Sequence, residues 1–136
     1  MSNKQYQKYK KSQYETASQE QLLIMLYNGA IKFGNQAKKA MEEGKIDLAN
    51  NKLKRTQAII NELIVTLDMD KGGEIAQNLY SLYEYMNRRL VQSNIRKEPK
   101  IVDEVISLLE DLKESWMEVI KKLKQKKNNQ NLSIQK

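Results

Sequence analysis

The sequence predicts an all-α fold, an antiparallel up-down four-helix bundle, on the basis of three observations. Four long segments repeat apolar residues with the 3.6-residue period of an amphipathic helix. None of the four shows the sustained two-residue alternation of a β-strand. The breaks between them are three to seven residues long, which places successive helices antiparallel. We therefore expect residues 16–124 to form one bundle.

The ends of the predicted helices carry recognisable stop and start signals. Ser18 and Gln21 have the spacing of a capping box at the start of the first helix, which closes at Gly44. Asp47 is a candidate N-cap for the second helix. The run 70–73, DKGG, separates the second and third helices, and Pro99 prevents the third from continuing into the fourth.

The first helix is more apolar than packing on one side requires, especially over residues 22–33 (LLIMLYNGAIKF). At about 100° per residue, one face holds Leu22, Leu23, Leu26, Ala30, Phe33 and Ala37. Ile24, Tyr27 and Ile31 widen the apolar arc to roughly 200°, whereas an ordinary surface helix needs about 100°. This second sector is predicted either to lie deep in the bundle or to line a groove for a partner.

The other three helices each have an apolar face. The second helix uses Leu48, Leu53, Ile59, Ile60, Leu63, Ile64 and Leu67. The third uses Ile75, Leu79, Leu82, Tyr83, Met86 and Leu90. The fourth uses Ile101, Val105, Leu108, Leu109, Leu112, Trp116, Ile120 and Leu123. We expect these side chains to form the core, with Trp116 among them.

The two ends of the chain are polar, rich in lysine and without periodicity. Residues 1–15 are predicted to be a mobile N-terminal segment and residues 125–136 a disordered basic tail. Within the N-terminal segment, Tyr6 and Tyr9 have the spacing that puts both rings on one side of a helical turn. The ends also hold most of the net charge of +7: ten lysines lie in residues 1–14 and 121–136. Residues 15–120 then have a balance of −3, which argues against a nucleic-acid partner.

Composition excludes most catalytic and cofactor-binding sites. The chain has neither histidine nor cysteine, so zinc sites, Ser-His-Asp triads and thiolate chemistry are not expected. It also lacks both glycine-rich phosphate-binding motifs. We predict no enzyme activity, no catalytic residue, no metal and no cofactor. No apolar run approaches the ~20 residues of a membrane span, and no signal peptide is recognisable, so no membrane insertion and a cytoplasmic location are expected.

Several blocks together carry a resemblance to a known family. They are the N-terminal tyrosines, LLIMLYNGAIKF (22–33), TQAIINELIVTLD (56–68), YEYMNRRLVQSN (83–94) and LKESW (112–116). In order and spacing they resemble FliS, the flagellin-specific export chaperone, over about residues 6–120. The resemblance implies a small cytoplasmic four-helix bundle that binds the disordered C-terminal segment of flagellin. Such a protein prevents premature polymerisation of flagellin and supports its type III export, with the export apparatus as a further partner.

The resemblance also implies which residues bind the client. In the family, the N-terminal segment covers a hydrophobic surface and moves aside for flagellin. The residues carried over by position are Tyr6, Tyr9, Ile24, Tyr27 and Ile31. Tyr80 and Tyr85 fall off the main apolar face of the third helix and are candidate contacts at the rim of the interface.

Two other interpretations stay open at this point. A helical scaffold that acts through homodimerisation would form a stable dimer, whereas a chaperone covered by its own N-terminus would be a monomer or weak dimer. Residues 116–127 place Trp and aliphatic side chains before a lysine cluster, which is also the pattern of a helix lying on a membrane surface.

Overall fold

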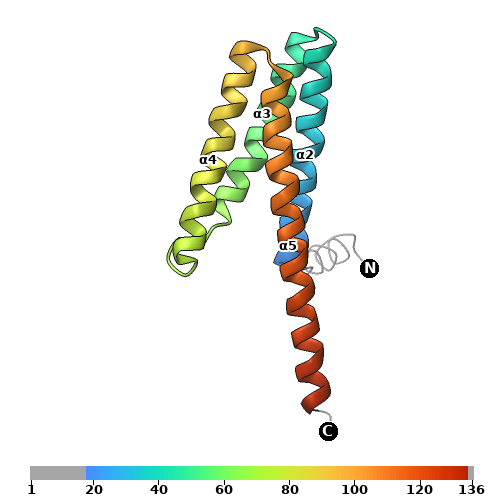
Figure 1. The fold of residues 1–136 in the computed structure, drawn as a ribbon, viewed down its shortest axis with the longest axis vertical. Coiled ribbons are helices and arrows are strands. Elements are labelled where there is room, and N and C mark those ends of the chain that lie inside the picture. Colours follow the sequence, from blue (N-terminus) through green and yellow to red (C-terminus); the bar gives the residue numbers. More distant parts are fainter. Residues whose placement is uncertain (1–17, 135–136) are drawn as a thin grey trace, which may run out of the picture.

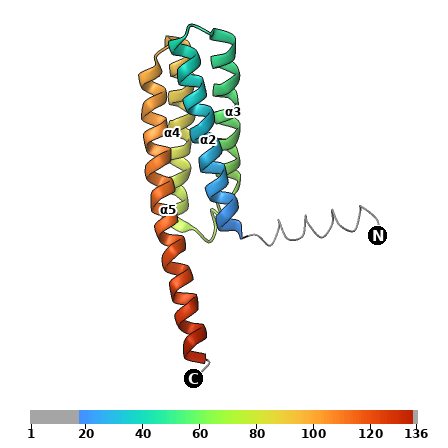
Figure 2. The same cartoon turned by 90° about the vertical axis from the view of Figure 1, so that its right-hand side faces the viewer.

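The computed structural model describes residues 18–134, which form four antiparallel helices (Figure 1). The helices are α2 (Gln19–Glu42), α3 (Ile46–Val65), α4 (Gly73–Arg96) and α5 (Pro99–Ile134). α2 packs against α3 and α5, and α4 packs against the same two helices. The order around the bundle is therefore α2, α3, α4, α5, which confirms the predicted up-down topology (Figures 1 and 2). None of these four helices combines the length and hydropathy that a membrane span needs.

We call the end that contains the turns at residues 43–45 and 97–98 the closed end, and the opposite end the open end (Figure 1). At the open end, the Ser18 hydroxyl accepts a hydrogen bond from the Gln21 backbone N–H at 3.3 Å, so the predicted cap is present. At the closed end, Gly44 has a φ of +72°, a left-handed conformation that glycine adopts readily. The N-cap of α3 is Lys45, and the predicted cap Asp47 lies in the first turn instead. A carboxylate there still interacts favourably with the helix dipole.

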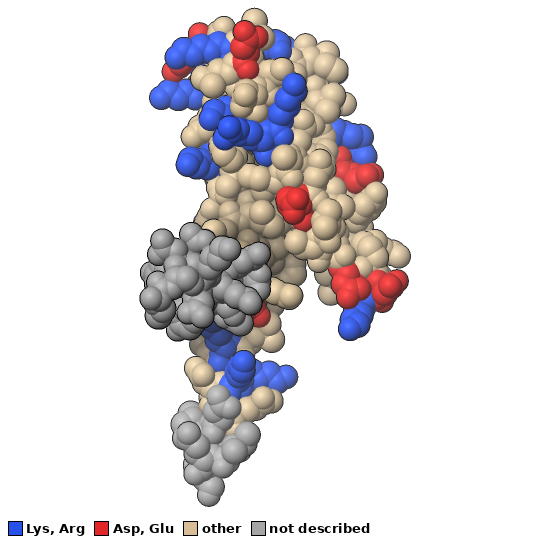
Figure 3. Space-filling view, turned by 180° about the vertical axis from the view of Figure 1, so that it is seen from behind, with Lys and Arg blue, Asp and Glu red and all other residues tan. Residues whose placement is uncertain are grey.

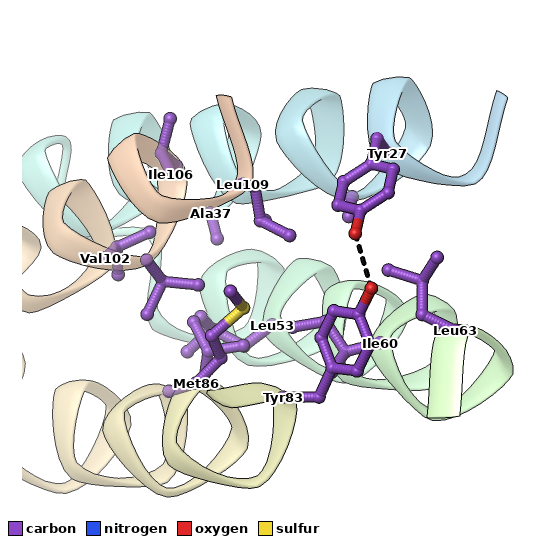
Figure 4. Close-up of a cluster of buried hydrophobic side chains, with 13 residues drawn as sticks. Tyr27, Ala37, Leu53, Ile60, Leu63, Tyr83, Met86, Val102, Ile106 and Leu109 are labelled. Atoms are coloured by element: carbon purple, nitrogen blue, oxygen red, sulfur yellow. Dashed lines mark hydrogen bonds between the residues drawn. The ribbon is translucent and has the colours of Figure 1, made fainter. Parts of the chain in front are cut away.

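The core is built closely around α2, whose central residues are small. Ala30, Gly34, Ala37 and Ala40 are all buried. A Cβ placed on Gly34 would lie 3.1 Å from Ile106 Cγ1, so the missing side chain lets α5 approach. The main buried cluster comprises Tyr27, Ala30, Ala37, Leu53, Ile60, Leu63, Tyr83, Met86, Leu90, Val102, Val105, Ile106 and Leu109 (Figure 4).

Helix α5 is longer than the sequence predicted. It runs to Ile134, well past the other three helices, so residues 125–134 are helical where a disordered tail was expected (Figure 2). The physical reason is that the packed part of α5 already provides the helix nucleus, which is the unfavourable step of helix formation. Adding lysine and glutamine residues to an existing helix costs little free energy. All residues from 121 to 130 are exposed, so packing contributes little to this extension.

Candidate binding groove

The open end holds an apolar groove with a cavity volume of about 610 Å³, which we call the end groove. Its lining residues come from three helices, α2, α4 and α5, and from the loop between α3 and α4: Gln19, Glu20, Leu22, Leu23, Leu26, Thr66, Leu67, Asp68, Gly72, Ile75, Ala76, Leu79, Tyr83, Trp116, Val119, Ile120 and Leu123. Four of its aliphatic side chains are strongly exposed to solvent, namely Leu22, Ile75, Val119 and Leu123. Apolar side chains gathered in a concave surface are typical of a site that receives a partner.

The loop between α3 and α4 bounds the groove and depends on two glycines. A Cβ on Gly72 would lie 2.6 Å from both the Asp68 backbone oxygen and the Ala76 Cβ, so no larger residue fits there. Gly73 has a φ of +55°. The Asp68 carboxylate accepts a hydrogen bond from the Lys71 backbone N–H at 3.0 Å. The DKGG run thus forms a tight turn, and α4 begins directly after it with Ile75 facing the groove.

Three aromatic side chains from three helices meet at the floor of the groove. Tyr27 of α2 and Tyr83 of α4 bond to each other through their hydroxyls (Figure 4). Trp116 of α5 donates its indole N–H to the Tyr27 oxygen at 3.1 Å. Tyr83 and Trp116 line the groove, whereas Tyr27 does not. This network ties α2, α4 and α5 together at the level where the groove begins.

Burial changes the acidity of both tyrosines. Desolvation is the largest cause, and it raises the pKa of Tyr27 and of Tyr83 above the ordinary value of 10. For Tyr83 the hydrogen bond to Tyr27 raises the pKa further. Both hydroxyls therefore keep their protons at neutral pH and act as neutral hydrogen-bonding groups.

The structure places Tyr27 in the core, which corrects its predicted position on a sector that faces a partner. Its side chain has no exposed surface, so it cannot touch a partner directly in this conformation. Leu26, which the sequence places on the main apolar face of this helix, is half-buried and lines the groove. The small residues Ala30, Gly34 and Ala37 shift the centre of the buried face toward Tyr27, because α5 packs closest where α2 has little side chain. The spacing of these three small residues was the sequence signal that could have predicted the burial of Tyr27.

Ile24 and Ile31 lie on the flank of α2 that borders α5, outside the groove. Lys38 marks this flank, since its ammonium lies 2.8 Å from the Asp103 carboxylate of α5. Ile31 lies seven residues before Lys38, and Ile24 lies seven residues before Ile31. Seven residues are about two helical turns, so all three residues lie on the same flank of α2. Both are half-buried, and Ile31 packs against the core cluster. Their exposed part forms a surface separate from the end groove.

Tyr80 and Tyr85 lie on opposite flanks of α4, about 140° apart at 100° per residue, so they do not form one surface. Tyr80 donates to Glu84 at 3.0 Å, within its own helix. Tyr85 donates to the Glu104 carboxylate of α5 at 2.5 Å, and Arg89 bonds to both oxygens of that carboxylate at 3.2 Å. Tyr85 thus takes part in the contact between α4 and α5. Neither tyrosine lines the groove.

The remaining predicted residues, Tyr6 and Tyr9, fall outside the described part of the chain. Sequence reasoning missed the groove itself, because Ile75 and Leu123 were assigned to the core, whereas they are 70% and 54% exposed. Trp116 is half-buried against the core and hydrogen-bonded to Tyr27, so it is not available to lie on a membrane surface. Within residues 18–134, no group of three acidic side chains is placed to hold a metal ion.

Comparison with known proteins gives a consistent result over most of the chain. The family model described as flagellar protein FliS matches residues 1–123. The flagellar secretion chaperone FliS of Vibrio cholerae is 36% identical over 117 residues, covering 83% of this chain and 86% of the relative. That of Salmonella typhimurium is 40% identical over 105 residues, covering 76% and 78%. That of Bacillus subtilis is 35% identical over 115 residues, covering 85% of each.

A solved structure supports the same fold. It is described as the crystal structure of a flagellar chaperone from bacteria and superposes with a TM-score of 0.73. The likeness covers 88% of this chain and 97% of the other, at 18% identity. The family match ends at residue 123, so the last part of α5 extends beyond it.

Proposed function

Because this chain belongs to the FliS family of flagellar chaperones, we propose that it binds the C-terminal segment of flagellin in the end groove. Bound in this way, flagellin would be kept from polymerising in the cytoplasm until the type III flagellar export apparatus receives it. The single observation that carries the proposal is the exposed apolar lining of the groove, contributed by α2, α4 and α5. An amphipathic helix laid into such a groove buries its own apolar face.

The groove alone is too small for the whole interaction. Ordering a disordered segment costs about 2–5 kcal/mol or more of the gross interaction energy, which requires a long contact surface. A cavity of about 610 Å³ holds only a short stretch of an occupant. The client therefore continues over neighbouring surfaces, among which the α2 flank with Ile24 and Ile31 is half-buried and apolar.

The N-terminal segment is a tethered competitor in this proposal. It joins the bundle at Ser18, next to Gln19 and Glu20 at the rim of the groove. Tyr9 is nine residues before Ser18, a reach of roughly 30 Å for an extended chain. A short tether holds a weak ligand at roughly millimolar effective concentration. Tyr6 and Tyr9 would cover the groove until a longer client displaces them.

The first experiment tests the client segment and the groove together. In isothermal titration, flagellin should bind with one-to-one stoichiometry, and flagellin without its last ~40 residues should not bind. Ile75→Glu should weaken binding at least tenfold, because it puts a charge into the apolar groove. Ile95→Glu is the matched control, since Ile95 lies at the other end of α4 and is similarly exposed. Equal affinities of the two variants would exclude the end groove as the binding site.

A second experiment separates the chaperone from the dimeric scaffold. Both would use exposed apolar surface, but a scaffold would bury it against a second copy. Size-exclusion chromatography with light scattering should show a monomer or weak dimer for the full chain. A stable dimer that persists on dilution and does not bind flagellin would favour the scaffold.

A further inference from the structure

The outer face of α5 carries an ordered stripe of charge. At about 100° per residue, Glu110, Glu114, Met117, Lys121 and Lys124 lie on one side of the helix, within a sector of about 80°. All five side chains are exposed, Met117 by 51%. The ion pairs formed within residues 18–134 use none of the four charged side chains. This stripe, which we call the α5 stripe, therefore presents its charges to solvent.

The charges of the α5 stripe are complementary to the same stripe in reverse order. Two glutamates precede Met117 and two lysines follow it. Glu110 and Lys124 each lie seven residues from Met117, and Glu114 and Lys121 lie three and four residues from it. If a second α5 lies antiparallel with the two Met117 side chains facing each other, every glutamate lies opposite a lysine. Such an interface has two-fold symmetry, whereas a parallel copy would place like charges together.

The charges beside the α5 stripe show the same division. Residues 107–118 hold four acidic side chains and one lysine, a balance of −3, whereas residues 119–130 hold five lysines and no acidic side chain. Most of this basic half belongs to the part of α5 that projects past the other helices (Figure 2). An antiparallel second copy would place its bundle beside this projection. The two bundles would then lie at opposite ends of the pair and would not collide.

We infer that the α5 stripe docks a second copy of this chain, antiparallel and centred on Met117. Exposed ion pairs contribute little each and are screened by salt, so the dimer is weak and sensitive to salt. The inference goes beyond the proposed function and concerns a different surface. Met117 and Leu123 are about 120° apart around α5, and only Leu123 lines the end groove. The dimer therefore leaves the groove open to a client.

Charge reversal on either half of the α5 stripe tests the pairing. One double variant carries Glu110→Lys and Glu114→Lys, and the other carries Lys121→Glu and Lys124→Glu. In analytical ultracentrifugation at low salt, the wild-type chain should dimerise with a dissociation constant below about 1 mM. Each double variant should dimerise at least about tenfold more weakly, because like charges then face each other. A double variant that dimerises as tightly as the wild-type chain would overturn the inference.

A third double variant controls for the change in net charge. Glu42→Lys with Glu62→Lys raises the formal net charge by four, as the glutamate reversal on α5 does, but both positions are exposed and lie on α2 and α3. Its dimerisation should stay within roughly threefold of the wild-type value. A loss as large as that of the α5 variants would show that net charge, and not the stripe, controls association.

Mixing the two α5 variants tests complementarity directly. The first then presents only lysines around Met117, and the second only glutamates. Their equimolar mixture should associate at least as tightly as the wild-type chain, and the chain with all four substitutions should regain wild-type affinity within about threefold. All four positions are exposed, so the variants should fold. If one double variant does not fold, the fourfold variant still decides, because its failure to dimerise would contradict the pairing.

Titration with flagellin separates this inference from the proposed function. The α5 variants should bind the C-terminal segment of flagellin within about twofold of the wild-type affinity, because the end groove is a separate surface. A wild-type chain that stays monomeric at about 1 mM would overturn the inference, and a loss of flagellin binding in its α5 variants would assign the stripe to the client instead. A chain that dimerises but does not bind flagellin would overturn the proposed function alone.

Discussion

The two halves of the bundle are packed by different means. Toward the closed end, the small residues Gly34 and Ala37 of α2 bring the neighbouring helices close, and Leu90 and Val102 are buried between them. Lys and Arg side chains gather over the outside of this half (Figure 3), where Lys52 and Arg55 each lie 5.4 Å from the centre of the Phe33 ring. Toward the open end, large aromatic residues span the bundle, and aliphatic side chains stay exposed in the groove.

The difference shows how one short chain can hold both a stable fold and a site for a partner. Close packing at the closed end supplies stability, since each fully buried aliphatic side chain contributes about 1.5–3 kcal/mol. At the open end, the aliphatic side chains of the groove stay exposed, so they do not contribute this burial energy to the fold. Hydrogen bonds among Tyr27, Tyr83 and Trp116 hold three helices together where the aliphatic contacts end. The four predictions below test this division.

The largest effect should come from a core leucine of α5. Leu109→Ala should lower the free energy of unfolding by about 2–5 kcal/mol, because Leu109 is fully buried. Leu123→Ala on the same helix should cost less than about 1 kcal/mol, because Leu123 is half exposed, yet it should weaken flagellin binding. Urea unfolding and isothermal titration measure the two effects. Similar losses of stability would contradict the division of the bundle.

High pH should act on the tyrosines of the open end. The pKa values of Tyr27 and Tyr83 are raised by burial, so the unfolded chain releases these protons first. Their contribution to stability is complete below about pH 10 and is lost as the pH rises toward the folded pKa values. Each tyrosine should then lower the free energy of unfolding by up to about 1.4 kcal/mol per pH unit. Denaturant titrations between pH 9 and pH 11.5 measure this slope.

The matched control for the pH dependence is the double variant Tyr27→Phe, Tyr83→Phe. It keeps Tyr80 and Tyr85, which are exposed, so any difference in slope belongs to the buried pair. A slope as steep as that of the wild-type chain would show that the two hydroxyls ionise as easily in the folded state as in the unfolded state.

Two helical glycines of α2 should respond differently to the same substitution. Ala is favoured over Gly within a helix by about 1 kcal/mol. At Gly29 the new methyl would meet the terminal Cδ1 of Ile59 at 3.1 Å, which can rotate away, so Gly29→Ala should be neutral or stabilising. At Gly34 it would meet Cγ1 of Ile106, closer to the backbone of α5, so Gly34→Ala should lower the melting temperature. Thermal unfolding of both variants tests this order, and a stabilised Gly34→Ala would show that α2 and α5 are not closely packed.

The smallest effect should come from the projecting part of α5. Deleting residues 126–136 should change the free energy of unfolding by less than about 0.5 kcal/mol, because residues 126–130 are all exposed. The helical signal in circular dichroism should fall with the deletion, since this part is helical. Deleting from Trp116 onward is the contrasting variant and should destabilise the bundle strongly, because it removes the indole that bonds to Tyr27. A strong loss from the shorter deletion would place the extension among the stabilising elements.

The sequence by itself determined the four helices, their antiparallel order and most of the core. Periodicity marks which side of each helix is apolar, and Ser18, Gly44 and Pro99 mark where helices start and stop. Short connections leave little choice of topology. The same local signals do not set the end of α5, because lysine and glutamine suit an exposed helix as well as a disordered tail.

Only the tertiary structure decided which apolar residues are buried and which line the groove. Ile75 and Leu90 lie on the same apolar face of α4, yet the first is mostly exposed and the second is buried. The apolar pattern of a helix shows on which side of its axis each residue lies. Burial depends instead on how close the neighbouring helix comes at each position along that axis. That distance follows from side chains on other helices, such as Gly34 opposite Ile106 and the aromatic network at the groove floor. Pairwise distances between helices are not encoded in the periodicity of any one of them, and so the groove emerged only from the assembled bundle.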